Sequence, residues 1–166
     1  MSAAELLLGT PEETAALGER VGRLLRAGDL VLLSGDLGAG KTTFTRGLAQ
    51  GLGVRGPVTS PTFVIAREHP SLVGGPVLVH VDAYRLGSLA EVDDLDLDTA
   101  AEEAVTVVEW GRGLVEELTG DRLEIDLLRP HGAAPAGQDP QAEAPVEPRR
   151  ALVRGIGARW AEVDLA

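Results

Sequence analysis

The sequence predicts a single α/β domain built on a mainly parallel, twisted sheet. Three observations lead to this prediction. Short continuous apolar runs, typical of strands that are buried on both faces, alternate along the chain with helical patterns. A glycine-rich loop joins one of these runs to the helix that follows it. The 166 residues are the length of one domain, and such a chain buries roughly 70% of the surface that it exposes when unfolded.

Two helices and the strand between them are expected in the first third of the chain. Residues 10–13 (Thr-Pro-Glu-Glu) begin a helix with an N-cap and a proline at the first helical position, and Gly28 is its expected end. Residues 30–33 (Leu-Val-Leu-Leu) predict a buried strand. Apolar residues then recur at helical spacing from Phe44 until Gly53, which predicts a second helix.

The middle of the chain adds two buried strands. The apolar run 77–81 ends at Asp82, and the run 105–108 ends at Glu109. A shorter strand is expected at 64–66, before a Gly-Gly-Pro turn. Residues 89–104 are strongly acidic and are expected to be helical or irregular. A short helix is expected at about 112–118.

The C-terminal part predicts a pair of antiparallel strands at an edge of the sheet. Residues 123–127 alternate apolar and polar, which favours a strand with one wet face, and residues 150–157 are its expected partner. Five of the ten prolines lie between them in 130–148, a composition typical of a disordered insertion, at about 130–149, within one domain 1–166. A last short helix is expected at 159–163.

Residues 35–42 match the phosphate-loop pattern G-x-x-x-x-G-K-[ST]. Its glycines let backbone N–H groups approach phosphate oxygens, Lys41 is a compact charge for the β/γ-phosphates, and Thr42 offers a hydroxyl to Mg²⁺. The order strand, loop, helix predicts a P-loop NTPase-like three-layer domain with a mainly parallel central sheet and C-terminal antiparallel strands. The expected nucleotide-binding residues are Gly35, Asp36, Leu37, Gly38, Ala39, Gly40, Lys41, Thr42 and Thr43.

Two carboxylates are the candidates for metal binding and for catalysis together with Lys41. Asp82 and Glu109 each end an apolar strand, so we expect both at the carboxyl edge of the sheet, beside the phosphates. One would ligate Mg²⁺ and the other would position or deprotonate the attacking water. Sequence alone leaves the division of these roles open.

Composition excludes several classes of function. The net charge of −11 argues against direct nucleic-acid binding. The absence of cysteine excludes disulfides and thiol chemistry and fits the cytoplasm, and no apolar run approaches the ~20 residues of a membrane span. The chain has no asparagine, and its only lysine lies in the phosphate loop, so it lacks the Asn-Lys-x-Asp signature of GTPases.

Two alternatives to an ATPase stay open on the residues. A small-molecule kinase would need an arginine-rich lid, for which Arg149, Arg150 and Arg154 are available, although the first two are expected to be solvated. A non-catalytic, nucleotide-gated binding module would need neither Asp82 nor Glu109 for turnover. The segment 60–63 (Ser-Pro-Thr-Phe) has hydroxyls that could sense a γ-phosphate, as a switch does.

Four motifs, in this order and spacing, resemble the bacterial TsaE (YjeE) family. They are residues 35–44, 60–63, 80–86 (His-Val-Asp-Ala-Tyr-Arg-Leu) and 108–111 (Val-Glu-Trp-Gly), and the resemblance covers about 10–128. It implies a small ATPase, with ATP and Mg²⁺ as cofactors, required for the threonylcarbamoyl modification of adenosine 37 in tRNA. Such a protein acts on the TsaB–TsaD heterodimer, meets tRNA only through that complex, and does not transfer the group itself.

The resemblance also implies roles for single residues. Thr42 and Glu109 would be associated with Mg²⁺, with Asp82 close by and important for hydrolysis, and the adenine end would lie near Thr10 and Pro11. The chain departs from the family at 92–98, which lacks a frequent glycine, and in the insertion. The remaining switch or partner residues would be Ser60, Thr62, Phe63, Tyr84, Arg85 and Trp110.

Overall fold

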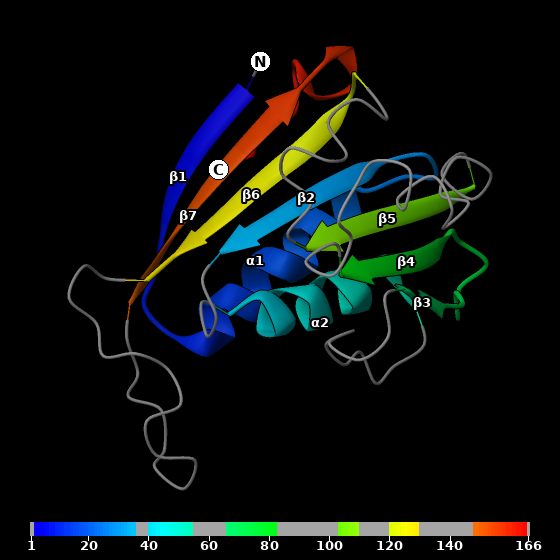
Figure 1. Cartoon of the computed structure of the whole chain (residues 1–166), viewed down its shortest axis with the longest axis horizontal. Helices are drawn as coiled ribbons and strands as arrows, with labels where there is room; N and C mark the ends of the chain where they lie inside the picture. Colours follow the sequence, from blue (N-terminus) through cyan, green and yellow to red (C-terminus); the bar gives the residue numbers. More distant parts are fainter. Residues whose placement is uncertain are drawn as a thin grey trace, which may run out of the picture.

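A computed structural model describes residues 2–35, 40–54, 66–82, 103–109, 120–129 and 148–165. Within these residues one seven-stranded sheet runs in the order β1-β7-β6-β2-β5-β4-β3, with two α-helices on one face (Figure 1). The strands are β1 (Ser2–Leu8), β2 (Leu30–Gly35), β3 (Ala66–His69), β4 (Val77–Asp82), β5 (Ala104–Glu109), β6 (Arg122–Leu128) and β7 (Arg149–Ile156). The helices are α1 (Pro11–Leu24), α2 (Lys41–Leu52) and a single 3-10 turn, η3 (Ala158–Trp160).

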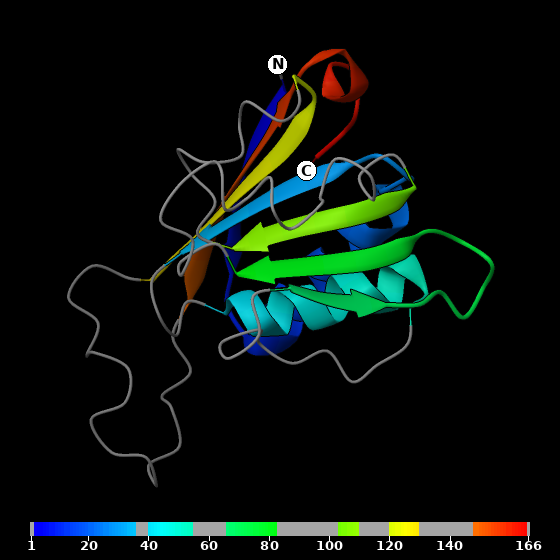
Figure 2. The ribbon, with the colours of Figure 1, turned by 45° about the vertical axis from the view of Figure 1, so that its right-hand side comes forward.

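The centre of the sheet is parallel and its flanks are antiparallel. β2 pairs in parallel with both β5 and β6, and β4 pairs in parallel with β5. β7 is antiparallel to β6 and to β1, and β3 is antiparallel to β4. The predicted α/β class, with a mainly parallel centre and antiparallel C-terminal strands, is confirmed. Figure 2 shows both helices below the same face of the sheet. Among the described residues these helices and the sheet form two layers, so the predicted third layer is not seen there.

The C-terminal strand pair is not at the edge of the sheet, contrary to expectation. β6 is parallel to β2 on one side, and β7 is covered by β1 on the other. Sequence did not predict β1 because residues 2–8 (Ser-Ala-Ala-Glu-Leu-Leu-Leu) are mostly good helix formers. Pairing along the whole of β7 overrides that local preference.

Helix ends agree with the capping signals, with two corrections. The Thr10 side chain accepts the Glu13 N–H at the start of α1, and Gly53 ends α2 with φ 80°. α1 ends at Leu24 rather than near Gly28, because the next residue is already extended. The expected C-terminal helix is shortened to the turn η3. In the described part of the chain, no helix combines the length and the apolar character that crossing a bilayer requires.

Several expected segments lie outside the described residues. They are most of the strand at 64–66, the acidic stretch 89–104 up to residue 102, the short helix at 112–118, and residues 130–147 of the insertion. The described chain resumes at residue 148, and Arg149 is already part of β7.

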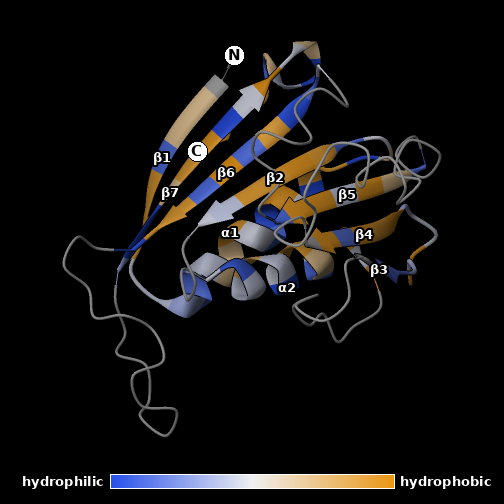
Figure 3. Ribbon diagram, in the orientation of Figure 1, coloured by the Kyte–Doolittle hydropathy of each residue, from blue (hydrophilic) through white to orange (hydrophobic). Residues whose placement is uncertain are grey.

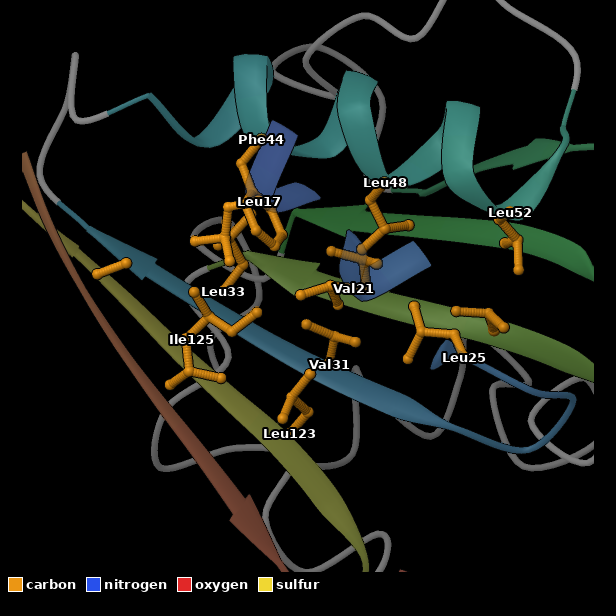
Figure 4. Packing of buried hydrophobic residues seen from close by; sticks show 14 of the residues in the cluster. Leu17, Val21, Leu25, Val31, Leu33, Phe44, Leu48, Leu52, Leu123 and Ile125 are labelled. Atoms are coloured by element: carbon orange, nitrogen blue, oxygen red, sulfur yellow. The ribbon is translucent and has the colours of Figure 1, made fainter. Parts of the chain in front are cut away.

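The core lies between the helices and the sheet. Hydrophobic residues dominate the inner strands, whereas β6 and β7 alternate (Figure 3). Figure 4 shows side chains of α1, α2 and the strands meeting in one cluster. Its central members are Leu17, Val21, Val31, Leu33, Phe44, Leu48, Val107, Leu123 and Ile125.

The two helices pack backbone against backbone through glycines. Each helix carries a Gly-x-x-x-Gly pair, Gly18 and Gly22 on α1 and Gly47 and Gly51 on α2. A Cβ placed on Gly47 would lie 2.0 Å from the Ala15 carbonyl oxygen, and the other three would come within 2.3 Å of carbonyl oxygens. Only glycine permits this approach, which holds α1 against α2 from Phe44 in its first turn to Leu52 at its end.

Candidate functional site

The phosphate loop begins where β2 ends and closes where α2 begins. Gly35 is the last residue of β2, and Gly40 precedes α2 with φ 103°, a left-handed conformation that favours glycine. Lys41 is only 8% exposed, and its Nζ donates to the Gly35 carbonyl oxygen at 2.8 Å. The lysine ammonium is therefore held across the loop, at the N-terminal end of α2, where the helix dipole favours anions.

Both candidate carboxylates belong to this edge of the sheet. In the parallel pair β4–β5, Asp82 is opposite Glu109, and each is the last residue of its strand. Glu109 is also in register with Leu33 of β2, two residues before the loop. Glu109 is only 4% exposed. The predicted convergence of the two strand ends at the phosphate loop is thus seen in the register, whereas the roles of the two residues stay predictions.

His80 is a partner of Glu109 that sequence reasoning did not find. Its Nε2 lies 3.1 Å from Glu109 Oε2. The solvent-exposed fraction of the side chain is 0% for His80 and 5% for Glu109. With the carboxylate ionised, Nε2–H is the donor, and Nδ1 has no hydrogen-bond partner among the described residues. From the sequence, His80 is expected as a strand residue that could form a hydrogen bond, with no partner named. The available signal was its position two residues before Asp82, which strand periodicity places on the same face.

Replacing His80 with leucine is expected to lower the free energy of unfolding by about 2 kcal/mol, because a buried carboxylate loses its hydrogen-bond donor. Urea unfolding measures this change. Adding Glu109→Leu to that variant should recover part of the loss, because no buried charge is then left unpaired. His69→Leu removes the other buried histidine of the sheet and is the control for the loss of a buried imidazole as such. A double-variant cycle without coupling between His80 and Glu109 would contradict the pairing.

The start of α1 lies beside the loop on its other flank. A Cβ on Gly40 would be 3.4 Å from Thr14 Cγ2, in the first turn of α1, and 3.7 Å from both Cδ and Nε of Arg149. Leu8 is opposite Arg149 in the β1–β7 pair, so the turn at Thr10 and Pro11 is at this same edge.

The other predicted site residues divide by where the described chain runs. Thr42 and Thr43 lie in the first turn of α2 and are half-buried. No group of three potential metal-ligating His, Asp or Glu side chains occurs in the described ranges. The predicted residues outside those ranges are Asp36, Leu37, Gly38, Ala39, Ser60, Thr62, Phe63, Tyr84, Arg85 and Trp110.

Two of the three arginines that a kinase lid would need are engaged elsewhere. Arg150 pairs with Glu5 at 3.2 Å, and Arg154 pairs with Asp126 at 3.0 Å and with Glu124 at 3.2 Å. These ion pairs join β1, β6 and β7 within the sheet.

Fold and site together define a P-loop-like α/β protein: a parallel strand runs into a glycine loop, and the next helix opens on Lys-Thr. Comparison with known proteins is more specific. The family model described as "Threonylcarbamoyl adenosine biosynthesis protein TsaE" matches residues 8–134. The chain belongs to the TsaE family and takes part in tRNA threonylcarbamoyladenosine biosynthesis. The resemblance in the sequence motifs is thereby confirmed.

Individual relatives agree with this assignment. The Streptomyces coelicolor TsaE protein is 60% identical over 151 residues, which cover 90% of this chain and 95% of that one. The Bacillus subtilis TsaE protein is 43% identical over 72% of this chain and 73% of its own. Among solved structures, the crystal structure of Bacillus subtilis YdiB matches with a TM-score of 0.68 at 32% identity, over 96% of this chain and 89% of that one.

Proposed function

We propose that the chain binds ATP with Mg²⁺ at the phosphate loop and hydrolyses it. In this proposal it acts on the TsaB–TsaD complex, does not itself transfer the threonylcarbamoyl group, and meets tRNA only through that complex. The observation that carries the proposal is the placement of Lys41 and Thr42 at the start of α2, with Glu109 at the end of the strand beside β2. The absence of cysteine fits a reducing compartment, so we propose the cytoplasm as its location.

The donor set at the loop suits a magnesium ion. Mg²⁺ prefers oxygen ligands, and Thr42 offers a hydroxyl and Glu109 a carboxylate. His80 contacts Oε2 of Glu109 and would hold the carboxylate in place for the metal. When bound, Mg²⁺ neutralises charge on the phosphate oxygens. Lys41 binds the β/γ-phosphates, and Asp82, on the next strand, orients the attacking water.

Phosphate release tests the reaction. The purified chain is mixed with ATP and Mg²⁺, with and without TsaB–TsaD, and inorganic phosphate is measured over time. We expect slow release from the chain alone and faster release with the complex. Loss of ATP that is matched by phosphorylation of a small acceptor would identify a kinase instead. Binding without phosphate release in either setting would identify a nucleotide-gated module.

Substituting Lys41 tests the phosphate loop directly. Lys41→Ala is expected to weaken ATP binding about 30-fold, because the charge-assisted contact of a buried lysine is lost. Lys41→Arg should lose less, because the charge remains although the larger fork fits poorly. Calorimetry measures both affinities, with Arg46→Ala, an exposed cation of the same helix, as control. Unaltered affinity in Lys41→Ala would rule out the loop as the phosphate site.

A further inference from the structure

Arg149 and Arg150 are consecutive residues of β7 with different surroundings. Both were expected to be solvated. Arg150 is exposed and pairs with Glu5 of the neighbouring edge strand β1. Arg149 lies beside Gly40, at the N-terminal end of α2, with Cδ and Nε both 3.7 Å from the position that a Cβ on Gly40 would take. Its register partner Leu8 belongs to the core cluster, which lies on the helix side of the sheet.

The sheet order sets which side of the loop Arg149 occupies. β2 leads into the loop, β5 with Glu109 lies on one side of it, and β6 followed by β7 lies on the other. Arg149 and Glu109 therefore flank the loop from opposite sides. Thr14, in the first turn of α1, contacts Gly40 from the same side as Arg149.

The negative charge of the expected ligand favours a cation at this position. A nucleoside triphosphate is a polyanion, and the chain has a net charge of −11 with a single lysine. One buried cation, Lys41, is within the loop. An arginine beside Gly40 adds a planar, multidentate donor for phosphate or ribose oxygens next to the N-terminal end of α2.

We propose that Arg149 is a second cation of the nucleotide site and binds the part of the nucleotide away from the γ-phosphate. This inference rests on the proposed binding of ATP. Because Mg²⁺ and the γ-phosphate belong on the Glu109 side, the α-phosphate and ribose extend toward β7, where the Arg149 guanidinium lies. Arg149 then contacts ADP and ATP equally and does so with or without Mg²⁺. Arg149 would thereby set the affinity for nucleotide without taking part in hydrolysis.

The test compares two neighbouring arginines that differ in placement. The affinity of the full-length chain for a fluorescent (N-methylanthraniloyl) ADP is measured by titration, and ADP and ATP are then used as competitors, each with and without Mg²⁺. Arg149→Gln is expected to weaken ADP and ATP about tenfold, by the same factor, in both conditions. Arg150→Gln, which removes the same charge from the next residue, should bind as wild type does. Arg149→Lys should lower the affinity for both nucleotides about threefold, because lysine keeps the charge but lacks the planar guanidinium with its several donors.

Each other outcome is decisive. Equal affinities for Arg149→Gln and Arg150→Gln would overturn the inference while leaving the proposed function intact. A loss confined to ATP would also overturn it, because Arg149 would then act on the γ-phosphate. Failure of the wild-type chain to bind any nucleotide would overturn the proposed function and this inference with it. Thermal melting checks the fold of each variant, and if Arg149→Gln is unfolded, Arg149→Lys decides: wild-type affinity there would overturn the inference.

Discussion

Replacing Glu109 with glutamine is expected to lower partner-stimulated ATP hydrolysis about 300-fold while changing metal-free nucleotide affinity less than about twofold. Glutamine keeps the shape of the side chain but removes the negative charge that a metal ligand supplies. The hydrogen-bond geometry with His80 survives only if the amide presents its oxygen to Nε2. The expected loss is therefore in the use of Mg²⁺, rather than in the binding of the nucleotide as such.

The measurement separates metal use from folding. Phosphate release is followed at increasing Mg²⁺ concentration, and nucleotide affinity is measured in a chelator. Glu124→Gln is the matched control, because Glu124 is a partly buried carboxylate of the same sheet that pairs with Arg122 and Arg154. Asp82→Asn, measured in parallel, should lower hydrolysis without shifting the Mg²⁺ dependence. A Glu109→Gln variant that hydrolyses ATP at the wild-type rate would remove Glu109 from the catalytic assignment.

Replacing Gly47 with alanine is expected to lower the free energy of unfolding by about 3 kcal/mol, and replacing it with leucine to prevent folding. Alanine is the better helix former by about 1 kcal/mol, so propensity alone predicts the opposite sign. The added Cβ would lie 2.0 Å from the Ala15 carbonyl oxygen, far inside a van der Waals contact. The two helices would have to move apart and would lose contacts of Phe44 and Leu48 with the core.

Urea unfolding followed by circular dichroism measures this effect. Gln50→Ala, at an exposed position of the same helix, is the control and should change the free energy of unfolding by less than about 0.5 kcal/mol. Because α1 presses on the first turn of α2, Gly47→Ala should also weaken nucleotide binding at temperatures where it remains folded. An alanine variant as stable as the wild type would mean that the helices are not in backbone contact.

Local patterns predicted most of the elements but not the contacts between them. The N-cap at Thr10, the strand 30–33 and the helix end at Gly53 follow from neighbouring residues, and the structure agrees with them. β1 was missed because its composition favours a helix until β7 pairs with it. The glycines of α1 and α2 recur at a spacing of four in the sequence. Their role in the contact between the helices could not be inferred, because the sequence does not show that the two helices lie side by side.

The phosphate loop is what the sequence determined by itself. The motif is a continuous run of residues, so the match from Gly35 to Thr42 is recognisable without knowing where the strand and the helix lie. Two carboxylates at strand ends could also be inferred, because parallel strands bring their carboxyl ends to one edge.

Only the tertiary structure decided which side chains lie at the same edge of the sheet as that loop. His80 contacts Glu109, which lies 29 residues further along the chain on the neighbouring strand. Arg149, near the C-terminal end of the sequence, lies beside Gly40. Strand order sets such contacts, because β6 pairs with β2 and β7 pairs with β6, which brings distant residues to one edge. Periodicity records which face a residue occupies, but it contains no information about the strand that becomes its neighbour.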